Sequence, residues 1–355
     1  MISQTISSKC ATFIGAALLA LALATGSHAQ QQPTLTVYTY DAFAADWGPA
    51  PKVKKAFEEF CRCQLNFVAA DSSIGALRKV QLEGANTKAD IVLGLDTNIA
   101  EAARLTGLFA NHEIATDNLS IPAIRSTPAD SGIAINSWRD EIFLPFDYSY
   151  FAFVYNKEKI ENVPTSFEQL AAMPDDFKIV IQDPRSSTPG LGLLLWIKAI
   201  YGDETTKIWQ SIAPKILTVS KGWSDSYGLF LKGEADMVLS YTTSPAYHLI
   251  AEQDANYAYA PFAAGHYMQI EVAGILKSSP NKKLARQFMQ FMLTDAFQDI
   301  IPTTNWTYPV VKTKQGLPDG FKTLAVPDIS LLMDGRQIEA HRKQWIDEWL
   351  QAIRK

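Results

Sequence analysis

The stretch ADIVLGLDTNIAEAARLTG, residues 89–107, contains the pattern that decides the fold class. Ala89 to Leu95 form an apolar run rich in branched side chains, which predicts a buried strand. Asn98 to Thr106 follow with helical spacing, and Gly107 is placed to end that helix. A buried strand that leads directly into a helix is typical of α/β folds, in which helices cover both faces of a mostly parallel sheet.

The same alternation extends from this stretch in both directions. On its amino-terminal side, the pattern predicts strands at Thr34–Tyr40 and Leu65–Ala69 and helices at Lys52–Phe60 and Leu77–Gly84. Residues 111–140 lose periodicity and read as irregular connection. Beyond them the predicted strands are 178–181, 216–219 and 236–240, and the predicted helices are 191–201, 205–212, 226–232, 246–252, 282–293 and 335–353.

Two longer extended stretches, Glu141–Tyr155 and Tyr267–Leu276, predict strands that cross between two lobes. Each lobe is then discontinuous in sequence. The first is expected to comprise residues 30–146 and 272–310, and the second residues 147–271 and 311–355. Such stiff crossings predict a hinge, and hinge closure over a ligand is the motion they favour.

The amino terminus predicts export. Lys9 precedes an almost wholly apolar run from Ala11 to Gly26, and the Ser27-His28-Ala29 motif predicts cleavage before Gln30. Residues 1–29 are therefore expected to be a signal peptide. The net charge of -5 over 355 residues gives no positive surface for a phosphate backbone, so nucleic acid is not expected as a partner.

Only Cys61 and Cys63 remain after the predicted cleavage. In an oxidising exported compartment the two either form a small disulfide or stay as separate thiols. A structural zinc site needs four ligands at characteristic spacing, and no second pair of ligands stands near these cysteines. The sequence therefore predicts no metal site.

Polar residues follow the predicted strands, where ligands bind in open α/β sheets. Tyr40 ends the first strand, and Asp71-Ser72-Ser73 follows the second. Ser187-Thr188-Pro189 and Tyr241-Thr242-Thr243-Ser244-Pro245 each precede a predicted helix, as expected for helix caps. Helix amino termini can hold a phosphate or carboxylate, although capping alone is the commoner reason for such residues.

Aromatic residues gather in the predicted loops and at the ends of elements, away from periodic apolar faces. They are Tyr40, Trp47, Trp223, Tyr241, Tyr247 and Trp306. Aromatic faces stack on flat rings and attract cations. With Asp41, Asp46 and Asp71 nearby, the pattern favours an organic cation that contains an aromatic ring. No G-x-S-x-G, H-E-x-x-H or phosphate-loop motif is present, so no catalytic residues are assigned and no enzyme is expected.

Long runs of the sequence resemble the periplasmic thiamine-binding proteins of bacterial ABC importers. The runs are LTVYTYDAFAADWGP, ADIVLGLD, FDYSYFAFVYNK, QDPRSSTPGLGLLLW, KGWSDSYGLFLKGEADMVLSYTTSPAYH, GHYMQIEV and IPTTNWTYPV. The resemblance implies the two-lobed type II periplasmic-binding-protein fold, with mostly parallel sheets covered by helices. It also implies a receptor that needs no cofactor. Its ligands would be thiamine, thiamine phosphate and thiamine diphosphate, which it would deliver to a membrane permease driven by an ATPase.

The resemblance further implies roles for particular residues. Tyr40 and Trp47 would line the cleft from the first lobe, and Trp223, Tyr247 and Trp306 would enclose the two rings of the ligand. Polar atoms or phosphate would be bound by Ser187, Thr188, Tyr241, Thr242, Thr243 and Ser244. Members of the family have Asp-Gly where this chain has Ser72-Ser73, so either Asp71 or a serine hydroxyl replaces that carboxylate contact.

Two alternatives share this fold. A thiaminase I-like enzyme would need a cysteine nucleophile, but Cys61 and Cys63 lie at the amino end of the second strand, away from the predicted cleft. A ferric-iron receptor would need the adjacent Tyr-Tyr pair of such proteins, which this chain lacks. A periplasmic monomer is expected, because the receptor must dock on a permease.

Overall fold

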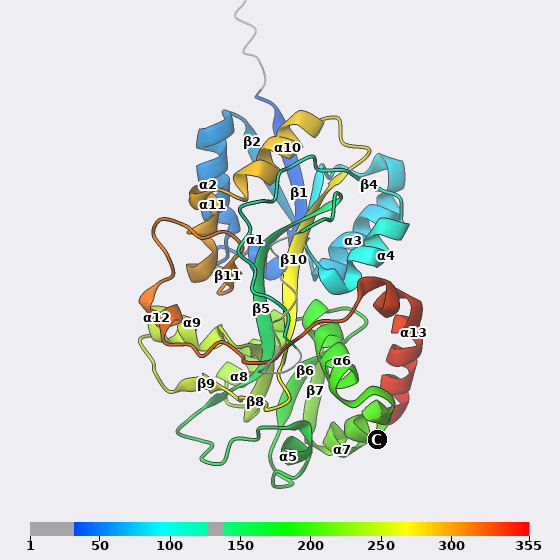
Figure 1. Cartoon of the computed structure of the whole chain (residues 1–355), viewed down its shortest axis with the longest axis vertical. Helices are drawn as coiled ribbons and strands as arrows, with labels where there is room; N and C mark the ends of the chain where they lie inside the picture. Colours follow the sequence, from blue (N-terminus) through cyan, green and yellow to red (C-terminus); the bar gives the residue numbers. More distant parts are fainter. Residues whose placement is uncertain (1–31, 126–137, 355) are drawn as a thin grey trace, which may run out of the picture. The chain divides into compact units, whose positions relative to one another are not determined.

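Strand β3 (Ile91–Asp96), from the stretch quoted above, is buried along its whole length in the interior of a mixed sheet. The structure, a computed structural model, describes residues 32–125 and 138–354. The predicted signal peptide, residues 1–29, lies outside the described residues. Within them the sheet has the strand order β2-β1-β3-β10-β5-β8-β6-β7 (Figure 1).

The first half of the sheet contains the strands predicted on either side of the quoted stretch. Strand β1 (Thr34–Tyr40) pairs in parallel with both β2 (Gln64–Ala70) and β3. The connecting helices are α2 (Ala50–Cys61), α3 (Ser73–Glu83) and α4 (Thr97–Leu105). Val53 and Phe57 are buried on one face of α2, as its apolar spacing predicts.

The second half repeats the arrangement. Strand β6 (Ile179–Gln182) pairs in parallel with β7 (Ile216–Ser220) and with β8 (Met237–Tyr241). Its helices are α6 (Thr188–Tyr201), α7 (Thr205–Ile212), α8 (Trp223–Leu231) and α9 (Ser244–Ala251). Helix α6 buries every residue from Thr188 to Ile197, which explains its apolar sequence LGLLLW.

Two long strands join the halves, and they lie side by side in Figure 1. Strand β5 (Phe143–Asn156) pairs with β10 (His266–Leu276) over residues 143–150 and with β8 over residues 151–155. Among the described strands, every antiparallel pair contains β5 or β10. The prediction of mostly parallel sheets is therefore correct only within each half, because a chain that crosses and returns must reverse its direction. The predicted lobe boundaries stay a prediction.

The remaining elements are short or lie near the carboxyl terminus. Helix α13 (Gly335–Ala352) packs on both α4 and α7, with Trp349 edge-on to Trp209 at a centroid distance of 6.2 Å. The other helices are α1 (Asp41–Ala44), α5 (Phe167–Ala171), α10 (Lys282–Phe291), α11 (Asp295–Gln298) and α12 (Asp319–Lys322). The short strands are β4 (Phe109–Ala110), β9 (Tyr257–Tyr259), β11 (Tyr308–Pro309) and β12 (Ser330–Leu331). Of the described helices, none is both long and apolar enough to cross a membrane.

Candidate ligand-binding site

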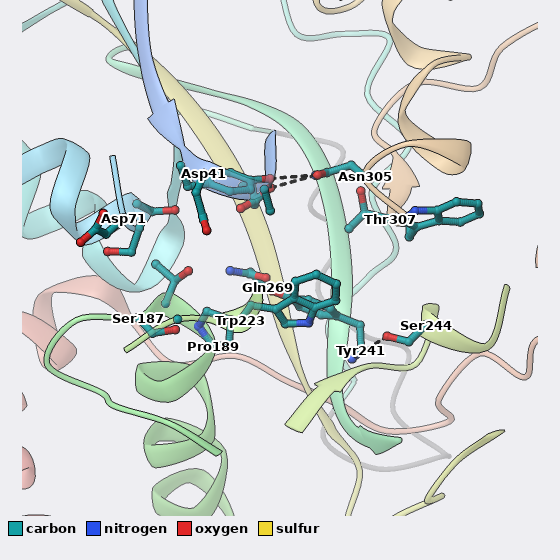
Figure 2. Close-up of a pocket in the computed structure, with 18 of the residues that line it drawn as sticks. Asp41, Asp71, Ser187, Pro189, Trp223, Tyr241, Ser244, Gln269, Asn305 and Thr307 are labelled. Atoms are coloured by element: carbon teal, nitrogen blue, oxygen red, sulfur yellow. Dashed lines mark hydrogen bonds between the residues drawn. The ribbon is translucent and has the colours of Figure 1, made fainter. Parts of the chain in front are cut away.

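The carboxyl ends of strands from both halves of the sheet meet around a cavity of about 80 Å³ (Figure 2). Eleven of its lining residues were predicted: Tyr40, Trp47, Asp71, Ser72, Ser73, Ser187, Thr188, Trp223, Tyr241, Ser244 and Trp306. A larger, apolar groove of about 630 Å³ adjoins the cavity and shares Trp47, Trp223, Ser244 and Trp306 with it. Tyr247, also predicted, lines this outer groove.

Tyr40 occupies the last position of β1, and its ring lies against the backbone of β3. A Cβ atom added at Gly94 would lie 2.4 Å from that ring, and Gly94 has a φ of 93°. Glycine at this position therefore permits both the backbone conformation and the close approach of the tyrosine. Trp47 follows α1 in a turn and is 55% exposed at the mouth of the cavity.

Two helix amino termini face the cavity, one from each half. Ser72 caps α3 by accepting a 3.0 Å hydrogen bond from the backbone N–H of Gly75, and Ser73 begins the helix. Ser187 precedes α6, but its hydroxyl makes no capping hydrogen bond. Gly190 lets α6 approach the end of β6, because a Cβ there would lie 2.4 Å from the carbonyl oxygen of Gln182. The helix dipoles and free N–H groups at both ends favour an anion.

The aromatic wall of the second half is built on Trp223, the first residue of α8. Its indole Nε1 donates a 2.8 Å hydrogen bond to Oγ of Ser240, which orients the ring. The indole stacks on Tyr227, at a centroid distance of 4.7 Å. Tyr227 is in turn hydrogen bonded through its hydroxyl to Nε2 of His248, at 2.8 Å. The ring that faces the cavity is thus held by a buried polar and aromatic column.

Trp306 lies in the left-handed region with φ of 58°. For a residue other than glycine this conformation costs about 1–2 kcal/mol, and such strain is found preferentially at functional sites. The indole ring packs edge-on against Tyr247, with centroids 5.2 Å apart. Trp306 and Tyr247 together close the cavity on the side of the outer groove.

The cavity is also lined by residues that the sequence analysis did not identify as ligand contacts. They include Asp41, Gln269, Glu271, Asn305 and Thr307. The hydroxyl of Tyr40 donates to Oε2 of Glu271 at 2.8 Å and lies 3.1 Å from Oδ1 of Asn305. Glu271 had a detectable signal, since it is the one charged residue in the strand HYMQIEVAGIL. Nothing in the sequence distinguished Asn305.

Two predicted residues, Thr242 and Thr243, line neither cavity nor groove, and their part in ligand binding stays a prediction. Both are fully buried in the turn between β8 and α9. The backbone N–H of Thr242 bonds to the carbonyl of Tyr150 at 2.9 Å, and Oγ1 of Thr243 lies 3.0 Å from Oγ of Ser149. These contacts join the turn to β5.

The two cysteines lie away from the cavity, and the possible metal ligands among the described residues are not grouped. Cys61 and Cys63 form a disulfide at the amino end of β2, whereas the cavity lies at the carboxyl ends of the strands. Within residues 32–125 and 138–354, no group of three histidine, cysteine or acidic side chains is placed to hold a metal ion.

A two-part α/β sheet with an aromatic and polar cavity at its strand ends defines a solute-binding protein. The sequence profile of the bacterial extracellular solute-binding proteins matches residues 35–299. The chain belongs to that family, and within it to the group that contains the thiamine-binding periplasmic proteins.

Three comparisons support this placement. The thiamine-binding periplasmic protein of Escherichia coli (strain K12) is 50% identical over 322 residues, which covers 91% of this chain and 94% of the relative. The protein of that name in Salmonella typhimurium is 49% identical and covers 94% of this chain and 98% of its own. A solved periplasmic thiamin binding protein superposes with a TM-score of 0.85 at 50% identity, covering 93% of this chain and 98% of its own. The predicted resemblance, fold class and periplasmic location are confirmed.

Proposed function

We propose that this protein is a periplasmic receptor that captures thiamine and its phosphate esters and delivers them to an ABC permease. The observation that carries the proposal is the cavity itself, which is lined by aromatic side chains and by the buried carboxyl group of Glu271. Thiamine combines a flat aminopyrimidine with a positively charged thiazolium ring. Stacking and cation–π contacts suit both rings, each cation–π contact contributing on the order of 0.5–2 kcal/mol.

The site residues fall into two groups in this proposal. Tyr40, Trp47, Trp223, Tyr241, Tyr247 and Trp306 contact the rings. Asp71, Ser72, Ser73, Ser187, Thr188 and Ser244 bind polar atoms, and the amino termini of α3 and α6 receive the phosphate groups of thiamine phosphate and thiamine diphosphate.

Closure of two lobes over the ligand is part of the same proposal, with the lobe boundaries predicted above. Three contacts in this structure join the two halves beside the cavity. The hydroxyl of Ser224 donates to Asp41 at 3.2 Å, Lys221 lies 3.7 Å from Asp71, and Nη2 of Arg78 donates to the carbonyl of Arg185 at 3.0 Å. All three are exposed and individually weak, which suits a site that must open again.

The receptor works as a monomer without a cofactor, and its permease is driven by an ATPase. We further propose that it is not an enzyme. Cys61 and Cys63 are joined to each other and lie away from the cavity, which counts against a thiaminase-like nucleophile. The relatives at 49–50% identity are named as thiamine-binding, which disfavours a ferric-iron receptor.

A fluorescence titration tests the proposal. Trp47, Trp223 and Trp306 all line the cavity, so saturable quenching of tryptophan emission by thiamine, at one ligand per protein, is the expected result. The thiaminase alternative predicts that thiamine is consumed on prolonged incubation with a nucleophilic base. The iron alternative predicts a visible tyrosinate-to-iron band on addition of ferric citrate and no response to thiamine.

A further inference from the structure

Three carboxyl groups lie abreast on three neighbouring strands, and the middle one, Glu271, lines the cavity. Glu271 of β10 is the register partner of Asp96 on β3 and also of Asp147 on β5. Both pairings are antiparallel, and directly opposed residues in such pairs project to the same face of the sheet. The three acids therefore form one row, named here the carboxyl row.

The carboxyl row is buried. Asp96 and Asp147 have no exposed surface, and Glu271 is 6% exposed where it lines the cavity. Like charges placed directly opposite one another destabilise a sheet, and a buried charge is costly unless it is paired. In the described part of the chain, none of the ion pairs involves a member of the row.

The groups around the row supply hydrogen bonds but no positive charge. Asn305 and Thr307 donate to Oδ2 of Asp147 at 2.6 and 2.8 Å, and Gln269 donates to Oδ2 of Asp96 at 3.1 Å. Oδ1 of Asp147 is buried and has no hydrogen-bond partner among the described residues. Asn98 on α4 also donates to Asp96, at 3.2 Å.

The titratable groups that face the row are all acidic. They are Tyr40 on β1, Tyr241 on β8 and Tyr267 on β10, besides the three carboxyl groups themselves. Burial raises the pKa of all three carboxyl groups, and the negative charge of Asp147 raises that of Glu271 further. Without a bound cation, the Asp147–Glu271 pair is therefore expected to hold a proton to a higher pH than an exposed carboxyl group does.

We propose that the carboxyl row is a proton-exchanging counter-charge: it holds a proton while the cavity is empty and releases that proton to solvent when a cationic ring binds. One positive charge enters as one leaves, so the charge balance of the buried site is kept. The inference rests on the proposed function for the identity of the cation. In this inference, Glu271 and Asp147 allow the site to distinguish a permanently charged ring from a neutral ring of the same shape.

The coupling sets the direction of the pH dependence. A cation lowers the pKa of the row, so binding favours the ionised form. Affinity for thiamine then falls as pH drops through the titration range of the empty row, by at most about tenfold per pH unit for one released proton. At higher pH the empty row is already ionised, and affinity reaches a plateau.

Calorimetry in two buffers of different ionisation enthalpy, at about pH 7, measures the released proton directly. The probes are thiamine and an analogue in which a neutral thiophene ring replaces the thiazolium. Thiamine should release protons, and the analogue, which has the same aminopyrimidine, should release none. Glu271→Gln should abolish the release and weaken thiamine at least about tenfold while sparing the analogue. Asp147→Asn is the second variant, and Glu234→Gln, at an exposed position away from the site, is the control.

The outcomes separate the two claims. Thiamine binding to wild-type protein without proton release would overturn this inference and leave the proposed function standing. Failure of folded wild-type protein to bind thiamine would overturn the proposed function, and the inference with it. If either variant fails to fold, the buffer comparison on wild-type protein still decides.

Discussion

The indole rings of Trp47 and Trp223 lie with their centroids 6.4 Å apart, although one follows the first strand and the other begins a helix in the second half of the sheet. The pair spans the two halves at the mouth of the cavity, next to the hydrogen bond from Ser224 to Asp41. Aromatic contact between the halves therefore coincides with the ligand site. A ring bound there would be enclosed by residues from both sides.

Trp306 is expected to be an aromatic anchor of the ligand. Trp306→Ala should weaken thiamine binding by about 2–4 kcal/mol, because it removes a large ring from a buried contact. Stability should change little, since the side chain is only partly buried. Titration calorimetry and thermal unfolding of the same sample measure both effects.

The control for Trp306 is Phe60→Ala. Phe60 is 56% exposed and packs on Phe57 and Phe291, far from the strand ends that form the cavity. Its removal should leave thiamine affinity unchanged. Equal affinity of wild-type protein and Trp306→Ala would show that the ligand does not occupy this cavity.

Gly94 positions Tyr40 in the site. Gly94→Ala and Gly107→Ala both place a side chain at positive φ, 93° and 69°, which costs about 1 kcal/mol. Only at Gly94 does the new Cβ also meet a tyrosine ring, at 2.4 Å, whereas nothing lies within 4 Å at Gly107. Gly94→Ala should therefore be the more destabilising variant, by about 1–3 kcal/mol, and the one that weakens ligand binding.

Denaturant unfolding and thiamine titration of the two glycine variants provide the comparison. A similar loss of stability in both would mean that only backbone conformation matters. The proposed placement of Tyr40 in the binding site would then lose its support.

The amino terminus of α6 should discriminate phosphate esters from thiamine itself. Removing the hydroxyl group by Thr188→Val should lower affinity for thiamine diphosphate by about 1.5–3 kcal/mol, the usual contribution of a hydrogen bond to a charged group. Affinity for thiamine should hardly change. Ser166→Ala, at the cap of α5, is the matched control away from the site. If Thr188→Val lowered the affinity for thiamine and for thiamine diphosphate equally, the phosphate groups would not bind at the amino terminus of α6.

His266 should make the protein sensitive to acid. Burial lowers its pKa to about 4, from about 6.5 in an unfolded chain. Folding thus favours the neutral imidazole, so its contribution to stability is complete above about pH 6.5 and is lost as pH falls toward 4. The loss is up to about 3 kcal/mol. Chemical denaturation as a function of pH should show a shallower acid slope for His266→Gln than for wild-type protein.

His341 provides the control for this slope, because it is exposed on α13. His341→Gln should reproduce the wild-type dependence on pH. An unchanged slope in His266→Gln would contradict the assignment of acid sensitivity to this buried ring.

Much of the fold could be predicted, because its elements have strong local signals. The alternation around residues 89–107 gave β3 and α4 within two residues of their observed ends. The long extended stretches gave β5 and β10 for the same reason. The antiparallel pairing of these two strands could not be predicted from local sequence signals, because it depends on which distant segments the crossing brings together.

The site shows the same limit. Trp223 and Trp306 stood out because they fell outside periodic apolar faces. The turn residues Thr242 and Thr243 stood out equally in the sequence, but they line neither cavity nor groove, and their turn is hydrogen bonded to β5. Glu271 and Asp147 gain their significance only from the register that places them opposite each other. No spacing in the sequence shows that relationship.

Calorimetric titration of mature protein, unfolded and refolded to remove any ligand carried from expression, tests thiamine recognition most directly. Thiamine, thiamine phosphate and thiamine diphosphate are titrated in parallel. Tight binding of one ligand per protein, with the three merely ranked in affinity, is the predicted result. An absence of binding heat for all three at more than one temperature, with protein shown to be folded, would contradict the proposed function.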